Sequence, residues 1–262
     1  MLGLGVGFYR LGGNQQRVYR GGIKFDLLTA LEAADHNDFT IAWDKDDRNA
    51  AGMSIAITMK FNSWDGTTYG SHGIISKSNE WAVYLLSGAL YFAVHDESAN
   101  KSKWWNLNKS EVEAHILPDT YYNFVFRTGA DTEGIYIDGT NRDNQAGTHS
   151  GFVADENLTG EMFIGKAQAL SSSDRSSFTF FKGTIDDVVI WKSAALMTVA
   201  QLQAYNNLVA NLHNKTGVSP LNDNGDYDIS DDVVAWYDFT SLEDSSGNNH
   251  DLTLTSGATK FV

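Results

Sequence analysis

The sequence Val233-Val-Ala-Trp-Tyr-Asp-Phe239 is followed by Asp244-Ser-Ser-Gly-Asn-Asn-His250 and then by Asp251-Leu-Thr-Leu-Thr255. The first stretch is apolar and aromatic, the second is rich in Ser, Gly and Asn, and the third alternates apolar with polar residues. This order predicts a strand, a turn and a second strand. The C-terminal part of the chain is therefore expected to supply strands to a β-sheet.

Short strands with frequent turn signals precede this unit. Residues 53–61 alternate between apolar and polar side chains, which is typical of a half-buried antiparallel strand. Ser87-Gly88 and Asp138-Gly139 are favoured dipeptides of two-residue hairpin turns. Further strands are expected at residues 73–77, 81–86, 89–95, 121–127, 134–139, 162–165 and 178–191. The pattern predicts an all-β, antiparallel sandwich or barrel.

One helix is expected at residues 198–212. Thr198 and Gln201 form a capping-box pattern, which satisfies backbone N–H groups of a first helical turn. Apolar residues then recur at helical spacing and give a stripe that would pack on a sheet edge. These residues are Leu202, Tyr205, Val209 and Leu212. The stripe predicts a short amphipathic helix with a structural role.

The composition fits one globular domain with an acidic surface. The chain has 262 residues, of which 42% are hydrophobic, so a single sandwich can bury a full core. Its formal net charge is −14, from 33 acidic and 19 basic residues. A phosphate backbone repels such a surface, so nucleic acid is not expected as a partner. The same charge keeps many copies soluble until they meet a partner.

Several classes of protein are disfavoured by what the sequence lacks. There is no cysteine, and therefore no disulfide or cysteine-based zinc site. No apolar run reaches the roughly 18 residues of a membrane span, and the N-terminus lacks the basic region and cleavage site of a signal peptide. We expect a protein without a membrane span that is made in the cytoplasm and is not exported by a signal peptide.

The chain divides into an N-terminal arm, residues 1–22, and a sandwich, residues 23–262, that is closed by residues 233–262. Glycines alternate with apolar residues at the start of the arm, a pattern that favours an extended segment laid against another surface. The side chains proposed for this contact are Leu2, Leu4, Val6, Phe8 and Tyr9. The arm anchors the protein in an assembly of many copies or, alternatively, packs as an edge strand on its own sandwich.

Four stretches occur in an order that resembles a known family. Gly73-Ile-Ile-Ser-Lys77 is followed by Tyr122-Asn-Phe-Val-Phe126 with the Gly134–Gly139 hairpin, then by Phe163-Ile-Gly165 and by Phe181-Lys-Gly-Thr-Ile-Asp-Asp-Val-Val-Ile-Trp191. Together they resemble laminin G-like modules of the concanavalin A-like lectin/glucanase superfamily. The resemblance implies a jelly-roll sandwich of two antiparallel sheets.

The position of the C-terminal unit indicates a class of proteins to which the chain is similar. In most members of that family the strand-turn-strand unit of residues 233–255 comes first, whereas here it comes last. This layout, with its glycine-rich leader, resembles structural proteins of bacteriophages, including marine phages. It implies a non-catalytic virion protein that decorates the capsid in many copies. The alternative is a receptor- or glycan-binding module on a tail or fibre.

Catalysis is not expected. Related glycosidases place paired carboxylates on one strand as Glu-x-Asp-x-x-Glu, so that an acid and a nucleophile flank one bond. The chain has no such motif, and Asp155-Glu156, Glu161 and Glu111-Val-Glu113 have the wrong spacing. Its seven histidines lack metal-ligand spacing such as His-Glu-x-x-His. We therefore predict no enzyme.

A structural calcium ion is the one cofactor that the sequence suggests. Asp223, Asp226 and Asp228 offer oxygen ligands at alternating positions, as hard cations require. Asp244 and Asn249 form a second candidate. The alternative for both stretches is an Asx-turn in which the side chains bond their own backbone.

Carbohydrate is the ligand that exposed aromatic residues would recognise. Trp104-Trp105 is the first candidate, and Trp64 with Tyr69 is the second. Adjacent residues of a strand point to opposite faces, so one of Trp104 and Trp105 is expected in the core. The other is a sugar platform or a protein contact, since interfaces favour aromatic residues as well.

Overall fold

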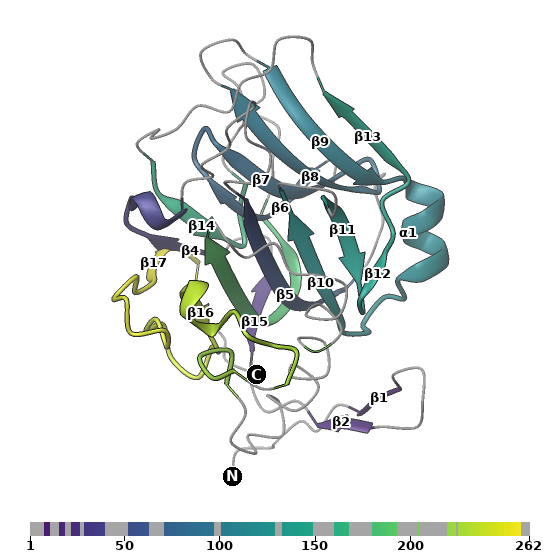
Figure 1. Cartoon of the computed structure of the whole chain (residues 1–262). Coiled ribbons are helices and arrows are strands. Elements are labelled where there is room, and N and C mark those ends of the chain that lie inside the picture. The colour runs from purple at the N-terminus through teal and green to yellow at the C-terminus, as the bar shows by residue number, and fades with distance from the viewer. Residues whose placement is uncertain are drawn as a thin grey trace.

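Two antiparallel sheets pack face to face in a computed structural model of the chain (Figure 1). The structure describes residues 8–10, 16–18, 22–26, 29–39, 52–62, 71–96, 101–128, 133–148, 160–167, 180–192, 204, 219–223 and 225–257. The arrangement confirms the predicted all-β sandwich.

The first sheet is built around β5 and β15, the longest strands that the structure describes. In spatial order its path is β12 (Thr140–Asn141), β11 (Gly134–Ile137), β10 (Tyr122–Arg127), β5 (Met53–Phe61), β15 (Lys182–Lys192) and β16 (Val233–Tyr237), with β3 (Ile23–Asp26) also paired to β15. Neighbouring strands are antiparallel throughout.

The second sheet is also antiparallel. Its order is β13 (Gln145–Thr148), β9 (Lys101–Leu107), β8 (Ala89–Asp96), β7 (Trp81–Leu86), β6 (Ser71–Lys77), β14 (Met162–Ile164), β4 (Ala30–Ala33) and β17 (Thr253–Ser256). Because β16 belongs to the first sheet and β17 to the second, the C-terminal unit contributes to both layers.

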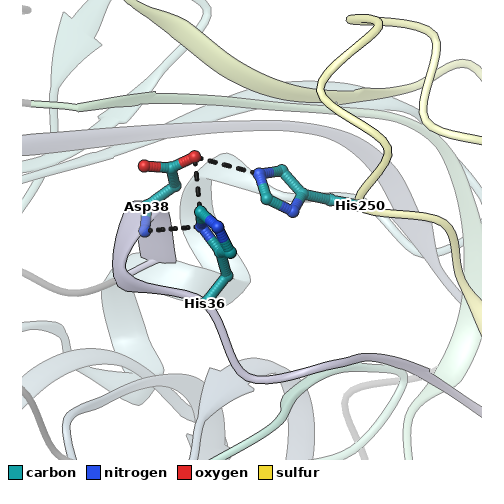
Figure 2. A group of neighbouring side chains, drawn as sticks. All are labelled: His36, Asp38 and His250. Carbon is teal, nitrogen blue, oxygen red and sulfur yellow. Dashed lines mark hydrogen bonds and ion pairs between the residues drawn. The ribbon is translucent and has the colours of Figure 1, made fainter.

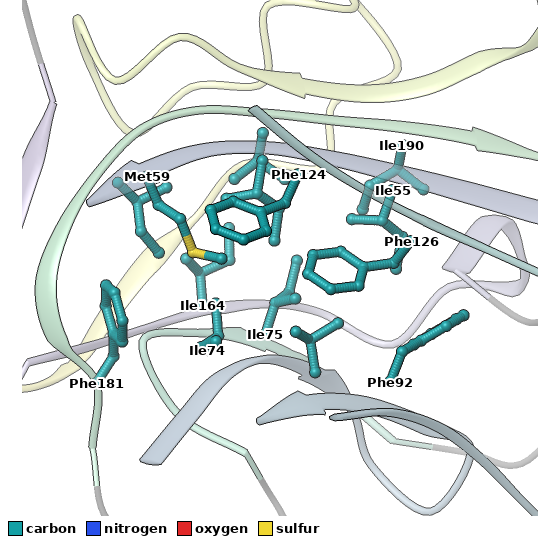
Figure 3. Close-up of a cluster of buried hydrophobic side chains, with 14 of the residues drawn as sticks. Ile55, Met59, Ile74, Ile75, Phe92, Phe124, Phe126, Ile164, Phe181 and Ile190 are labelled. Atoms are coloured by element: carbon teal, nitrogen blue, oxygen red, sulfur yellow. The ribbon is translucent and has the colours of Figure 1, made fainter. Parts of the chain in front are cut away.

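The core lies between the sheets and is made by every second residue of their strands. Figure 3 shows aromatic rings and aliphatic side chains from both layers in contact. The labelled members are Ile55, Met59, Ile74, Ile75, Phe92, Phe124, Phe126, Ile164, Phe181 and Ile190. Phe61 contacts Phe124 and Phe181 edge-on, at ring-centroid distances of 5.9 and 5.4 Å. This alternation is why a period of two in the sequence identifies the strands.

The predicted hairpin turns are present. Ser87 and Gly88 have φ angles of 52° and 85°, and Asp138 and Gly139 have φ angles of 47° and 80°. Two successive positive φ angles are the signature of a type I′ turn, whose twist matches that of the strands it joins. These turns set the registers of β7 with β8 and of β11 with the following strand.

The prediction that residues 53–61 form a half-buried strand was wrong. All residues of β5 except Lys60 are buried, including those that face away from the core. The outer face of the first sheet is covered by a segment of residues 219–233, in which Tyr227 is fully buried. Sequence alternation shows which side chains share a face, but it does not show whether distant chain covers that face.

The Phe181–Trp191 motif has structural reasons for its residues. A Cβ at Gly183 would lie 2.2 Å from the carbonyl oxygen of Lys60 on β5, so only glycine allows this close approach. The register between β15 and β5 shifts between Ile185 and Asp187, which makes Asp186 the extra residue of a bulge. The Asp187 carboxylate accepts a hydrogen bond from Trp236 Nε1 at 2.8 Å and so links β15 to β16.

A helix that the sequence reasoning missed follows β9. Helix α1 (Lys109–His115) begins after Asn108, whose side chain accepts the N–H of Glu111 at 3.1 Å. Two 3-10 turns are also described, η1 (Asn37–Phe39) and η3 (Ser230–Asp232). The predicted helix at residues 198–212 lies outside the described residues except for Ala204, which is helical. None of the described helices is long and apolar enough to cross a membrane.

The predicted arm contributes one short hairpin. Strands β1 (Phe8–Arg10) and β2 (Gln16–Val18) pair with each other as a two-stranded sheet of their own. Leu2, Leu4 and Val6 lie outside the described residues, and for Phe8 and Tyr9 only the backbone is described. Anchoring by this segment therefore stays a prediction.

Candidate functional site

Trp104 and Trp105 lie on opposite faces of β9, as predicted. Trp105 is 3% exposed and belongs to the core, where its ring stacks on Phe92 at a centroid distance of 5.4 Å. Trp104 is partly exposed on the outer face of the second sheet. Of the two, Trp104 is the one that a ligand outside the sandwich can reach.

Two tyrosines join Trp104 on this outer face. Tyr84 on β7 is directly opposite Tyr91 on β8, and their rings stack at 5.2 Å with an angle of 6° between the planes. Tyr91 meets Trp104 edge-on, at 6.3 Å and 63°. All three rings are partly exposed. We call Tyr84, Tyr91 and Trp104 the aromatic platform.

A glycine on the neighbouring strand makes room for Trp104. Gly147 on β13 is directly opposite Trp104, and a Cβ at this position would lie 2.4 Å from Cζ2 of the indole. The indole therefore lies over bare backbone instead of over a side chain. This contact fixes the ring at the edge of the sheet.

Asn106 places a polar group beside these rings. It is opposite Tyr91 on one side and opposite Gln145 on the other, on the same face as the aromatic platform. Asn106 is 3% exposed, and its Oδ1 has no hydrogen-bond partner. A buried carbonyl without a partner costs about 1–3 kcal/mol, so an acceptor of this kind marks a place where a donor can be gained.

Small side chains support the platform from below. Ala82 and Ala93 occupy the same outer face, and Ala167, from the segment after β14, packs against them. Tyr84 and Trp104 pack against this alanine cluster. Because the alanine side chains are small, the rings of Tyr84 and Trp104 project beyond them and stay partly exposed.

The sequence reasoning found part of this site. It identified Trp104 but missed Tyr84 and Tyr91, although the Ser87-Gly88 turn places these two tyrosines opposite each other. Trp64 and Tyr69, the second predicted pair, lie outside the described residues. The register set by this turn was a signal that could have paired the two tyrosines, whereas their approach to Trp104 depends on the separate pairing of β8 with β9.

The first predicted calcium stretch forms an exposed turn around a buried ring. Asp223, Asp226 and Asp228 are exposed, and Asp223 Oδ1 accepts the N–H of Ser230 at 3.2 Å. Tyr227, between them, is fully buried and donates from its hydroxyl to a backbone carbonyl. This bond spans seven residues, so it closes a loop and is not an Asx-turn, in which the side chain bonds the backbone two residues on. Calcium binding here stays a prediction.

Asp244, in the second predicted stretch, bonds its own loop. Its Oδ1 accepts the N–H groups of Trp236 at 3.0 Å and Ser246 at 2.9 Å. Its Oδ2 accepts the Ser246 hydroxyl at 2.8 Å and the N–H of His250 at 3.2 Å. Asn249 has a φ of 64°, the left-handed conformation that suits a turn. A calcium ion would have to compete with these bonds, and its binding also stays a prediction.

A different group of side chains does converge. Among the residues that the structure describes, one set of three or more metal-ligating side chains has ligand atoms within 4.8 Å of one another, namely His36, Asp38 and His250. Figure 2 shows both imidazoles directed at one carboxylate. No sequence pattern predicted this group, because the histidines are far apart in the chain and Asp38 reaches His250 across 212 residues.

A family model matches most of the sandwich. The model of the concanavalin A-like lectin/glucanases superfamily, of laminin G type, matches residues 31–201. No curated protein matches the chain in sequence.

Solved structures match the chain at low identity. A candidate carbohydrate-binding protein from Bacteroides ovatus ATCC 8483 has 12% identity and a TM-score of 0.56, over 96% of this chain and 64% of that chain. The binding domain of botulinum neurotoxin DC, in complex with rat synaptotagmin II, has 12% identity and a TM-score of 0.43, over 77% of this chain and 50% of that chain. Mouse laminin alpha1 domains LG4-5 have 9% identity and a TM-score of 0.44, over 72% and 44%. The chain therefore spans about half to two thirds of the length of these structures.

Proposed function

Because this chain belongs to the concanavalin A-like lectin/glucanases superfamily, we propose that it is a non-catalytic carbohydrate-binding protein whose aromatic platform contacts the glycan. The observation that carries the proposal is the group of three partly exposed rings, Tyr84, Tyr91 and Trp104, beside the unpaired carbonyl of Asn106. The fold that the chain shares with the Bacteroides ovatus protein supports it.

Aromatic rings suit sugars because the two surfaces match. The C–H groups on one face of a pyranose are apolar, and they can cover the open face of an indole or phenol ring while the hydroxyls stay in polar surroundings. On the platform the stacked rings of Tyr84 and Tyr91 are nearly parallel, whereas Trp104 is inclined to Tyr91 by 63°. Two orientations of ring favour a chain of sugars over a single flat ligand.

Selectivity among sugars would come from polar side chains beside the platform. Tyr91, Asn106 and Gln145 form one row across β8, β9 and β13. Asn106 and Gln145 are opposite each other in this row, and Gln145 is exposed. Amide side chains both donate and accept, so they can bond neighbouring hydroxyls of a sugar. Because Asn106 Oδ1 is buried, a sugar would reach it through a single hydroxyl or a bridging water.

The non-catalytic part of the proposal rests on the chemistry of these side chains. Glycoside hydrolysis requires two carboxyl groups on either side of the scissile bond. The residues that form the platform and its polar row are aromatic or amide side chains and glycine. They can hold a sugar, but they supply no general acid or nucleophile.

A glycan array of the full chain, followed by titration calorimetry with the best ligand, tests this proposal. Trp104→Ala should weaken binding at least tenfold, which corresponds to about 1.4 kcal/mol. Leu254→Ala is the control, because it truncates another exposed apolar side chain, 41% exposed, at the opposite edge of the same sheet. The proposal fails if no glycan binds, or if both variants bind the glycan equally well.

A place on a virus particle is the second part of the proposal. It is supported by the separate β1–β2 hairpin, which pairs with neither sheet, and by the acidic charge of −14, which suits display in many copies. Capsid decoration is the first setting and a tail or fibre is the alternative.

Immunogold electron microscopy of intact phage particles tests whether the protein lies on a virion and on which part of it. We expect gold over the heads for capsid decoration and gold at tail tips for a fibre module. A chain without residues 1–22 should no longer attach to particles. Particles that carry no gold would contradict the virion setting and leave the carbohydrate-binding proposal untouched.

A further inference from the structure

We propose that His36, Asp38 and His250 form a binding site for a divalent transition-metal ion, with Zn²⁺ as the best match. His36 Nδ1 lies 3.2 Å and His250 Nε2 lies 3.0 Å from the same oxygen, Asp38 Oδ2. Figure 2 shows the two rings approaching this oxygen from different elements. Asp38 lies in η1, His36 lies just before it, and His250 lies in the loop between β16 and β17.

The donor set selects the class of metal. Two imidazole nitrogens and one carboxylate oxygen suit zinc and its neighbours, whereas calcium and magnesium prefer sites made of oxygen. A tetrahedral zinc ion with bonds of about 2.0–2.1 Å holds adjacent ligand atoms about 3.3 Å apart. Two of the three separations, 3.0 and 3.2 Å, are close to this value, and the ligand atoms of His36 and His250 lie within 4.8 Å of each other, so the two rings would adjust around the ion.

Metal binding would replace the hydrogen bonds that now join these groups. The N–H of Asp38 donates to His36 Nδ1 at 3.2 Å, which requires that nitrogen to be unprotonated. His250 Nε2 lies 3.0 Å from Asp38 Oδ2. An ion needs both ring nitrogens unprotonated and the carboxylate ionised, so its binding would release these contacts to the metal.

Neighbouring groups hold the ligands in place. Lys192 Nζ lies 3.6 Å from Asp38 Oδ1, the oxygen that the histidines do not contact, so it orients the carboxylate and leaves Oδ2 to the metal. The backbone of His250 is held on both sides, by Asp244 Oδ2, which accepts its N–H at 3.2 Å, and by the Tyr237 hydroxyl, which donates to its carbonyl at 2.8 Å. The Phe39 ring packs against the His250 ring at 4.8 Å.

The site is open on one side. The His250 side chain is 7% exposed, whereas the His36 side chain is 52% exposed. An ion can therefore enter from solvent past His36, and water can complete its coordination. Because the ligands come from opposite ends of the sandwich sequence, the ion would join the C-terminal unit to the segment before β5 and stabilise the folded chain.

Thermal unfolding of the full chain with ZnCl₂, with MgCl₂ as the comparison salt, tests the site. At a hundredfold excess over Kd, zinc should raise Tm by about 5 °C or more, and magnesium should not. Calorimetry should give one zinc ion per chain. Co²⁺ in place of zinc should give visible absorption bands that report coordination directly.

Two variants make the result decisive. His36→Gln removes an exposed ligand, so the chain should fold as before and lose the zinc-dependent rise in Tm. His115→Gln is the control, because His115 lies 3.1 Å from Glu111 in another surface histidine–carboxylate pair, and it should keep the full rise. A wild-type chain that binds no zinc would overturn the proposal, and so would a His36→Gln chain that responds to zinc as the wild type does.

Discussion

The outer faces of the two sheets differ in how they meet solvent. On the first sheet a second apolar cluster is sealed by residues 219–233, and Tyr227 lies within it at 0% exposure. On the second sheet the outer cluster consists of three alanines, and Tyr84 and Trp104 beside it keep part of their rings open. Among the described residues, a cover is therefore present on the first sheet, whereas the aromatic side chains on the second sheet stay partly exposed.

The first predicted calcium stretch, which contains Asp223, Asp226 and Asp228, belongs to the segment that covers the first sheet. Its aspartates are exposed, whereas the tyrosine between them donates a hydrogen bond to Pro220 O at 2.5 Å and accepts one from Trp191 Nε1 at 3.2 Å. The buried ring and its two bonds fix the cover on the first sheet. Stability should depend on this region, and ligand binding should depend on the aromatic platform.

Removal of the buried ring should have the largest effect. Tyr227→Ala should lower the free energy of unfolding by about 3–5 kcal/mol, because it leaves a cavity under the cover. Tyr227→Phe keeps the ring, leaves two partners unsatisfied and should cost about 1–3 kcal/mol. Chemical denaturation measures both values. A Tyr227→Ala chain as stable as the wild type would mean that the cover is not held by this residue.

A substitution beneath Trp104 should affect binding instead. Gly147→Val places a side chain where the indole lies and should weaken glycan binding about tenfold, or about 1.4 kcal/mol. Stability should change little, since valine suits a strand. Ala146→Val, on the same edge strand but directed to the other face, is the control. Calorimetry that shows equal affinity for both variants would contradict the role of the platform.

Alkaline pH should lower the free energy of unfolding through the buried Tyr227. Burial raises the pKa of Tyr227, and Asp223 and Asp232 raise it further, against a lowering by the bond from Trp191. The folded state therefore keeps its proton above pH ~10, where the unfolded state loses it, and stability falls by up to about 1.4 kcal/mol per pH unit. Tyr227→Phe should reduce this slope between pH 10 and 11, as measured by denaturation at each pH. An unchanged slope would assign the effect to another group, such as Tyr237.

The smallest effect is expected at a buried arginine on the outer side of the first sheet. Arg127 is 1% exposed, its Nε and Nη2 have no hydrogen-bond partner, and burial lowers its pKa to about 10. Tyr136 offsets only part of this cost, through its ring at 5.9 Å and through a side-chain hydrogen bond to Arg127. Arg127→Met should leave the free energy of unfolding unchanged or raise it by about 1 kcal/mol. A loss above 2 kcal/mol in denaturation would show that the guanidinium is stabilising.

Local signals predicted most strands and both hairpin turns. Residues 81–86 and the Ser87-Gly88 turn were predicted as they occur, because strand periodicity and positive φ angles depend on residues next to each other. Helix α1 was missed although its signal is also local. Asn108 followed three residues later by Glu111 is a capping-box pattern, and no helix was predicted after it.

The amino-acid sequence by itself determined the antiparallel sandwich, the family resemblance and the presence of Trp104 on one face of its strand. Only the tertiary structure decided which outer face is covered, which rings accompany Trp104, and that His36 and Asp38 meet His250. The physical reason is the range of the interactions. Strands and turns depend on residues that are neighbours in the chain. The segment over the first sheet, the aromatic platform and the His36–Asp38–His250 group join residues that only the packing of distant segments brings together.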